Sequence, residues 1–312
     1  MGIVVIGATF VDIKGFPEDA YLPTGRNVGR VEYIHGGVAR NVVEDIANVE
    51  LRPTFLGIVD DTPLGEDVVR KLKNHKVDTR YILTAPDGMG TWLAVFDNNG
   101  DVAGSISKRP DMLPLLKLLE ERGDEIFRAA DSVVIEVDLE KDIVKRVLEL
   151  SEKHGKQVFG VVSNMSIAAK RRDFLQRFSC FICNQQEAGQ LFLDDYSGHT
   201  PQQLQQILVG KVAGARIPAM VVTMGARGAV YARITGESGY CPARNVFVKD
   251  TTGAGDAFCA GVAIGLTYGK SIDQAIEIGS TLAASVITSE ENVCPRFLPS
   301  ELGLEIPACV VE

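Results

Sequence analysis

The chain has 312 residues and a net charge of −9 at neutral pH. An acidic chain without a long basic run disfavours binding to nucleic-acid polymers or to a membrane surface. Apolar residues make up 46% of the sequence, which is typical of an ordinary soluble globular protein. A chain of this length buries enough apolar surface to fold without disulfides or a structural metal.

The amino terminus, MGIVVIGATF, has no basic flank and predicts a first β-strand rather than a signal peptide. No window approaches the about 20 apolar residues that a membrane helix needs. We therefore expect a cytoplasmic protein whose six cysteines are free thiols. Cys180 and Cys183 form a lone CxxC in an apolar run, and no second CxxC or nearby His completes a zinc set, so a metal or redox role is disfavoured.

Short apolar runs alternate with helical patterns along the chain. The runs near residues 3, 132, 157, 179 and 219 predict buried strands, and their apolar character on both faces predicts a parallel sheet covered on both sides. Helices are predicted over 38–49, 64–74, 111–129, 141–154, 200–215, 254–268 and 271–288. This order predicts one α/β domain over residues 1–312, with a doubly wound, mainly parallel sheet flanked by helices.

Two segments break the alternation of strands and helices. Residues 13–35 are rich in Gly and Pro and have little helical periodicity. Residues 88–107 hold two strand-like runs around Asn98-Asn99-Gly100, which predicts a hairpin. We expect the two segments to form a small β lid inserted into the α/β body; the alternative is a peripheral extension of the sheet with no catalytic role.

The segment Asp250-Thr251-Thr252-Gly253-Ala254-Gly255-Asp256 precedes a helical run and carries the strongest chemical signal. Small residues at 253–255 let a ligand approach the backbone. Free N–H groups at a helix start favour an anion such as a phosphoryl group in transfer. Asp256 is then placed to take a proton from an attacking hydroxyl. The alternative is a Gly-rich turn capped by an acidic residue.

DTTGAGDAFCAG resembles the carboxy-terminal signature of the PfkB family of ribokinase-like carbohydrate kinases, and other landmarks of that family follow its order over nearly the whole chain. The resemblance implies a ribokinase-like fold and transfer of the γ-phosphoryl group of ATP to a primary hydroxyl of a sugar or nucleoside. It implies that Asp256 is the catalytic base and that the amides of Gly253, Ala254 and Gly255 form the anion hole. It also implies that Thr252 lies beside ATP, and that Asp250 and the Thr252 carbonyl bind a monovalent cation such as potassium.

Gly36-Gly37-Val38-Ala39-Arg40-Asn41 resembles the amino-terminal signature of the same family. The resemblance implies substrate contacts by Gly36, Gly37 and Asn41. Asp12, expected at the end of the first strand, matches an acidic residue that binds sugar hydroxyls, and a carboxylate can accept hydrogen bonds from a vicinal diol. The alternatives are a plain helix start at the glycines and an ordinary turn residue at Asp12.

Two further landmarks concern ATP and magnesium. Asn184-Gln185-Gln186-Glu187 resembles the family's NxxE motif, which implies that Asn184 lies near ATP and that Glu187 holds magnesium through water. A helix cap at Asn184 is an equally compatible interpretation. Thr223, Gly225 and Gly228 are implied to lie along the ATP phosphates, and a tight turn between two strands is the alternative.

The form GGVARN resembles the pseudouridine kinase branch of the family, which implies phosphorylation of the 5′-hydroxyl of pseudouridine. Arg40 is then expected to hydrogen-bond the base or the sugar, and Lys170 to lie near the base; an exposed Arg40 is the alternative. A family kinase for another sugar or nucleoside would share every phosphate-side residue. Ser163-Asn164 stands where many members carry Asp-Pro, so the resemblance implies no contacts for this loop.

Two other classes of protein, an oxidoreductase and a non-catalytic binding protein, are alternatives to a kinase. A nicotinamide-dependent oxidoreductase is disfavoured because IVVIGATF supplies Gly7 without the rest of a G-x-G-x-x-G turn. A non-catalytic binding protein on a kinase scaffold is disfavoured by the intact TGAGD and NxxE motifs. The resemblance also implies a possible homodimer formed through the lid.

Overall fold

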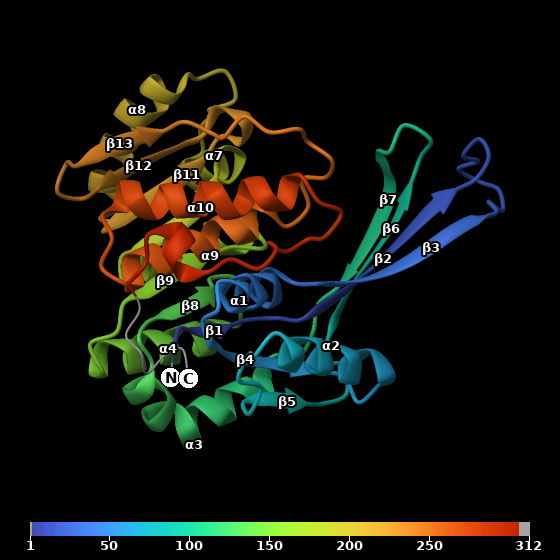
Figure 1. Cartoon of the computed structure of the whole chain (residues 1–312), viewed down its shortest axis with the longest axis horizontal. Helices are drawn as coiled ribbons and strands as arrows, with labels where there is room; N and C mark the ends of the chain where they lie inside the picture. The colour runs from blue at the N-terminus through green and yellow to red at the C-terminus, as the bar shows by residue number, and fades with distance from the viewer. Residues whose placement is uncertain (1, 306–312) are drawn as a thin grey trace.

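The computed structural model describes residues 2–305, which form an α/β body and a projecting second sheet (Figure 1). The strands are β1 (Val4–Ile6), β2 (Phe10–Pro17), β3 (Gly29–Gly36), β4 (Thr54–Val59), β5 (Ile82–Thr84), β6 (Gly90–Phe96), β7 (Val102–Lys108), β8 (Val133–Glu136), β9 (Val158–Val161), β10 (Cys180–Asn184), β11 (Ala219–Thr223), β12 (Ala229–Arg233) and β13 (Ser238–Cys241). The α-helices are α1 (Val38–Asn48), α2 (Pro63–Asn74), α3 (Leu113–Ala129), α4 (Lys141–Lys153), α5 (Met165–Ala168), α6 (Arg172–Leu175), α7 (Gln185–Phe192), α8 (Pro201–Ala215), α9 (Ala254–Thr267) and α10 (Ile272–Ile287). Two 3₁₀ turns are η1 (Gly225–Arg227) and η2 (Pro299–Leu302).

The main sheet has nine strands in the order β13-β12-β11-β10-β9-β8-β1-β4-β5. Its strands are parallel from β5 to β11, and β12 and β13 are antiparallel at one edge. The chain leaves β1 toward β4 on one side, whereas β8 leads through β9 and β10 to β11 on the other. The topological switch point therefore lies between β1 and β8, and ligands of such sheets bind outside the carboxyl ends of the strands at that point.

Alternate residues of the central strands enter two separate cores. Val4 and Ile135 belong to the core on one face, and Val5 and Val134 belong to the core on the other. Helices α3 to α8 cover the first face, and α1, α2, α9 and α10 cover the second. The predicted α/β fold is confirmed. The buried strand β4 was not predicted because its run, TFLGIV, contains Gly57 and stands between two helical patterns.

Helix α1 is buried on all sides rather than along one stripe. The sequence predicts an apolar face formed by Val38, Val42 and Ile46, but every residue from Ala39 to Asn48 is buried. The cause is that α1 packs against α9 as well as against the sheet (Figure 1). The polar residues of α1 therefore lie inside the protein.

The two segments that break the α/β alternation pair in a four-stranded sheet, in the order β3-β2-β6-β7. Strand β2 runs parallel to β6, and β6 and β7 form the hairpin expected around Asn98-Asn99-Gly100. The placement of Asp12 at the end of the first strand is wrong: β1 ends at Ile6, and Asp12 lies within β2. A three-residue β1 is followed directly by the strand that leaves the body.

The register of the second sheet gives it two different faces. Asp12 lies opposite Trp92, and Trp92 lies opposite Ser107, so these three side chains share one face. The neighbouring row has the opposite orientation because side chains alternate along a strand. That outer row is apolar and consists of Tyr33, Ile13, Leu93 and Ile106.

The five cysteines within residues 2–305 are free thiols, and Cys309 lies outside the described residues. Cys180 and Cys183 are buried, and burial raises the pKa of the Cys180 thiol to about 12. A thiol that stays protonated is a poor nucleophile and metal ligand, which argues against a role for the CxxC. Across the same described residues, no helix has the length and apolar character to cross a membrane.

The close approach of α9 and α10 depends on Gly261. A Cβ at this position would lie 2.5 Å from the Cα of Gly279. We predict that Gly261→Ala lowers the free energy of unfolding by about 1–3 kcal/mol, because the helices must move apart. Gly210→Ala is the matched control on α8: its Cβ meets nothing within 4 Å, and the change should stabilise by up to about 1 kcal/mol. Urea unfolding measures both, and an unchanged stability of Gly261→Ala would contradict the tight packing.

Candidate active site

Two cavities meet at the 250–256 loop. The larger has a volume of about 330 Å³ and opens at the switch point between the α/β body and the second sheet. Thr252, Gly253 and Asp256 line it, whereas Ala254 and Gly255 line a second cavity of about 150 Å³. The loop therefore separates two binding spaces, and a group that passes between them must cross the start of α9.

The local conformation of this loop requires glycine at 253. Gly253 has φ 80°, and a Cβ there would lie 1.9 Å from the carbonyl oxygen of Asn292. No side chain caps α9, so its N-terminal amides are available to an anion. Of the three predicted anion-hole amides, that of Ala254 also donates to the Thr251 carbonyl at 3.2 Å. The loop thus offers a positive helix end to whatever lies between the two cavities.

Asp256 lies in the first turn of α9 and faces the larger cavity. Asn41 Nδ2 donates a hydrogen bond of 2.6 Å to Asp256 Oδ2. Burial raises the pKa of the Asp256 carboxyl to about 7, against the lowering influence of Asn41 and Arg40. A carboxylate with a pKa near neutrality can take a proton from a hydroxyl and release it again.

The glycine signature and Asp12 meet in the same cavity. Asp12, Gly37 and Asn41 line it together with Asp256, and burial raises the pKa of Asp12. Gly37 has φ 99° at the start of α1. Gly36 does not line the cavity. Its lack of a side chain leaves room for the Asp12 carboxylate, because a Cβ at Gly36 would lie 2.8 Å from both carboxylate oxygens.

Glu136, at the carboxyl end of β8, was not predicted. Its carboxylate accepts hydrogen bonds from the amide of Ala39 at 2.8 Å and from that of Ala8 at 3.3 Å. Burial, reinforced by Asp138, raises the pKa of Glu136 to about 8. Gly7 makes space for it, since a Cβ there would lie 2.8 Å from Glu136 Oε1. The sequence signal that could have identified it is the position of Glu136 at the carboxyl end of the apolar run SVVIE, where ligands of parallel sheets bind.

Other residues of the cavity also escaped prediction. They share no motif and come from the second sheet and from the loops after it and after α10: Trp92, Ser107, Arg109 and Asn292. The one available signal was the single tryptophan of the chain within the predicted hairpin. Ser163 and Asn164, which replace the expected Asp-Pro, line this cavity as well. Ser163 donates from N and Oγ to Asp138 at 2.9 and 2.7 Å, which fixes the loop.

The exposed alternative for Arg40 is wrong, and the structure brings neither Arg40 nor Lys170 to the lining of the two cavities. Arg40 is 1% exposed and lines neither of the two cavities. It is therefore neither a surface residue nor in contact with the substrate space. The periodicity of α1 hid this because it does not reveal that α9 covers the second side of the helix. Lys170 is exposed after the short helix α5 and also lies outside both cavities.

The smaller cavity and the NxxE motif lie at neighbouring strand ends. Thr223, Gly225 and Gly228 line this cavity, beside the turn η1 that joins β11 to β12. Asn184 caps α7, and Glu187 completes the capping box by accepting from the Asn184 amide at 2.7 Å. Burial, with a further contribution from Asp138, raises the pKa of Glu187.

Asp250 is held by its neighbour in the loop. Its Oδ1 accepts from Thr252 N and Thr252 Oγ1, both at 2.8 Å. Burial alone would raise the pKa of Asp250, but these bonds outweigh it and the pKa is lowered. The carboxylate is thus kept ionised. Within residues 2–305, no group of three or more His, Cys, Asp or Glu side chains could hold a metal ion by itself.

Residues 2–294 match the model of the pfkB family carbohydrate kinases. The chain belongs to this family. A guanosine-inosine kinase from Exiguobacterium acetylicum is 36% identical over 299 residues, covering 95% of this chain and 98% of the relative. A pseudouridine kinase from Escherichia coli K12 is 22% identical over 293 residues, covering 92% of this pfkB kinase and 91% of the relative.

Solved structures confirm the ribokinase-like fold of this pfkB kinase. Arabidopsis thaliana ribokinase complexed with ribose and ATP matches with a TM-score of 0.84 and 20% identity, over 96% of this chain and 97% of that one. Ribokinase from Thermotoga maritima matches with a TM-score of 0.76 and 17% identity, over 96% and 97%. The chain is therefore a phosphotransferase for a sugar or nucleoside hydroxyl, and the oxidoreductase and non-catalytic alternatives are set aside.

Proposed function

We propose that this kinase transfers the γ-phosphoryl group of ATP to the 5′-hydroxyl of a nucleoside, with inosine and guanosine as the first candidates. The observation that carries the proposal is one cavity that holds Asp256 and Asp12 together with flat apolar walls from Phe10 and Trp92. Asp256 is suited to the 5′-hydroxyl of a ribose and Asp12 to its vicinal hydroxyls, and the aromatic walls are suited to stack on a base. The 36% identity with a guanosine-inosine kinase supports a purine base.

Pseudouridine is the second candidate. The resemblance of GGVARN to the pseudouridine kinase branch favours it, but the substrate contact by Arg40 that this resemblance implies has no support, because Arg40 lies outside the cavity. The pseudouridine kinase is also the more distant relative, at 22% identity against 36%. A purine nucleoside therefore has the stronger support.

The chemistry follows from the two cavities. The nucleoside occupies the larger cavity with its 5′-hydroxyl at Asp256, which accepts the hydroxyl proton. The adenosine part of ATP would extend from the loop over the smaller one, whose walls are mostly small or apolar residues, such as Phe258, Gly225 and Gly228. Amides of Gly253 and Gly255, at the uncapped start of α9, donate to the phosphoryl oxygens during transfer. Asp12 and Asn41 orient the ribose, and the neighbouring Gly36 and Gly37 keep its approach open.

Two cations belong to this proposal. Magnesium, when bound with ATP, would neutralise the phosphate charge, and the partly buried carboxylate of Glu187 would hold it through water. Asp250, which stays ionised, and the Thr252 carbonyl would hold potassium beside the loop. We assign the activity to the cytoplasm, where ATP is available and thiols stay reduced.

The second sheet has two tasks in this proposal. Its inner face brings Asp12, Trp92 and Ser107 to the cavity, and its closure as a lid excludes water from the reaction. Its outer row exposes Ile106 at 71% and Tyr33 at 61%. Exposed apolar side chains in one row suit pairing with a second copy of the chain, so we propose a homodimer formed through the lid.

A substrate panel tests the proposed function. Purified protein with ATP and magnesium is offered inosine, guanosine, pseudouridine, adenosine, uridine and ribose, and ADP release and the 5′-phosphorylated product are measured. We expect the highest kcat/KM with inosine or guanosine. Preference for pseudouridine would reverse the order of the candidates, preference for ribose would overturn the nucleoside assignment, and no turnover of any member would refute the proposal.

The pH dependence of kcat/KM tests Asp256. Because its pKa is raised to about 7, the carboxyl is protonated at lower pH and cannot accept a proton. We predict that kcat/KM falls as pH drops through about 7. Asp256→Asn should lower kcat by about 10²–10⁴-fold above pH 7 and should remove this acid limb. ATP binding measured by calorimetry is the control and should change little. An Asp256→Asn protein with wild-type turnover would rule out the base.

Sedimentation analysis tests the homodimer. We predict that Ile106→Lys shifts the protein toward the monomer, because a charge in the apolar row must be desolvated on pairing. Val102→Lys is a control on the same strand: it is also exposed but lies outside that row, so a smaller effect is expected. A monomeric wild type at micromolar concentration would contradict the assembly.

A further inference from the structure

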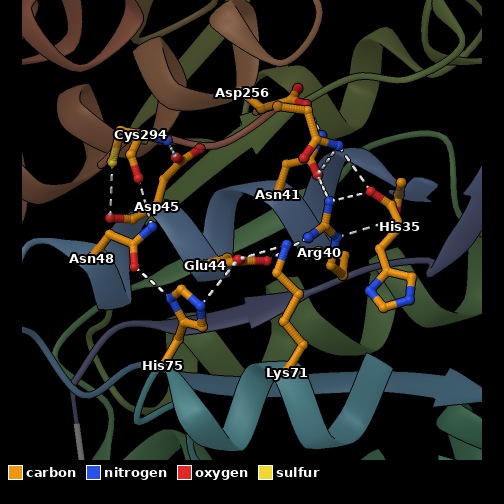
Figure 2. Close-up of polar contacts among 12 residues, drawn as sticks. His35, Arg40, Asn41, Glu44, Asp45, Asn48, Lys71, His75, Asp256 and Cys294 are labelled. Carbon is orange, nitrogen blue, oxygen red and sulfur yellow. Dashed lines mark hydrogen bonds and ion pairs between the residues drawn. The ribbon is translucent and has the colours of Figure 1, made fainter. Parts of the chain in front are cut away.

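Arg40 is a buried cation that no step of the proposed chemistry uses. Figure 2 shows its guanidinium on α1, between Glu44 on one side and Asn41 on the other. Nη1 pairs with Glu44 Oε2, Nη2 donates to Asn41 Oδ1 and to the His35 carbonyl, and Nε donates to the Gly36 carbonyl at 3.4 Å. A buried ion pair adds little stability compared with an apolar pair of the same volume. The arrangement of these contacts therefore needs another explanation.

The contacts of Arg40 decide which way the Asn41 amide faces. Asn41 Oδ1 accepts from Arg40 Nη2 and, at 3.3 Å, from Asn292 Nδ2. Asn41 Nδ2 is left to face Asp256 Oδ2, at 2.6 Å. A flipped amide would turn its oxygen toward a carboxylate, and two acceptors cannot share a hydrogen bond. Arg40 thus excludes the one rotamer that would leave Asp256 without its donor.

We infer that Arg40 is a positioning residue for phosphoryl transfer, which acts through Asn41 to hold the Asp256 carboxylate in place and does not bind the substrate. The inference rests on the proposed role of Asp256 as the base. It differs from a substrate contact because Arg40 lies outside the cavity that Asn41 and Asp256 line.

Arg40 also has an electrostatic effect on Asp256. The largest electrostatic influences between this carboxyl and other titratable groups involve six residues from five elements: Asp12 of β2, Arg40 and Asp45 of α1, Glu136 of β8, Glu187 of α7 and Cys259 of α9. Of these six, only Arg40 is positive. Arg109 lines the same cavity as Asp256. His35, whose carbonyl Arg40 holds, has a pKa lowered by burial and then by Arg40 itself, which favours its neutral form. Loss of Arg40 should therefore favour protonated Asp256.

Glu44 secures the other side of the guanidinium. Its carboxylate is fully buried, and besides Arg40 it lies 3.2 Å from Lys71 Nζ and 3.6 Å from His75 Nε2 (Figure 2). Removing Arg40 alone would leave this charge inside the protein with weaker partners, which endangers folding. The informative variant removes both charges together.

The test compares wild type with Arg40→Met/Glu44→Leu and Arg40→Lys. In the double variant we expect kcat to fall about 10–100-fold, because the base loses its fixed geometry. KM for the nucleoside should stay within about twofold, and the acid limb of the kcat/KM profile should move up by about one pH unit. Arg40→Lys keeps the charge but not the fork of donors, so its acid limb should stay near that of wild type while kcat is lowered.

Arg177→Met is the matched control, since Arg177 pairs with Glu152 at 2.7 Å and lines neither cavity. It should leave kcat, KM and the acid limb unchanged. A raised KM with unchanged kcat in the double variant would make Arg40 a substrate contact and overturn the inference. A lowered melting temperature, with kcat, KM and acid limb of the folded protein unchanged, would reduce Arg40 to a structural role and overturn it as well.

If the proposed function is wrong, the wild-type protein phosphorylates no member of the substrate panel. The inference is then decided without catalysis, by ¹³C NMR titration of the Asp256 carboxyl, assigned with Asp256→Asn. A higher Asp256 pKa in the double variant than in wild type supports the inference. An equal pKa overturns it.

Discussion

A single hydrogen bond, from Asn41 Nδ2 to Asp256 Oδ2 at 2.6 Å, joins the first turns of two helices that lie 215 positions apart in the chain. It forms only because both helices begin at glycines with positive φ, Gly37 at 99° and Gly253 at 80°. Those two turns bring the starts of α1 and α9 to the same place above the switch point of the sheet. The larger cavity depends on this convergence, because residues from the starts of both helices line it.

The meeting of the two helix starts places several carboxyl groups close together around the larger cavity. Asp12, Glu136 and Asp256 line one cavity, and burial raises the pKa of each carboxyl. The protein offsets this charge with hydrogen bonds from backbone amides to Glu136 and with the buried guanidinium of Arg40. A carboxyl with a pKa near 7 at Asp256 is the result of this balance, and such a pKa suits the proposed base because stronger solvation would make it a weaker proton acceptor.

The loop proposed to bind the phosphoryl group could be recognised in the sequence as the start of a helix, because its residues are local. Gly253, Gly255 and Asp256 stand within one turn of each other, and a Gly-rich start of a helix has the same physics in any fold. The alternation of strands and helices likewise predicted the layers. The burial of Arg40 could not be predicted from the sequence. The periodicity of α1 identifies the face that packs on the sheet, but it does not reveal that α9, which begins at residue 254, covers the opposite face.

The residues that line the larger cavity come from segments far apart in the sequence, because strand pairing and loops bring them together. The proposed phosphoryl-binding residues, by contrast, lie in one short loop. Asp12 and Trp92 meet because β2 pairs with β6, and Asn164 and Asn292 reach the same space from loops after β9 and α10. Trp92 and Asn292 belong to no local pattern. Asp12 and Trp92 come from the second sheet rather than from the loop that carries Asp256, whereas Asn292 packs against Gly253 of that loop. A fold of this kind holds phosphoryl chemistry constant in one segment while the nucleoside or sugar is chosen by side chains from several. The motif GGVARN therefore relates more directly to the contacts around Asp256, the proposed base, than to the choice of substrate.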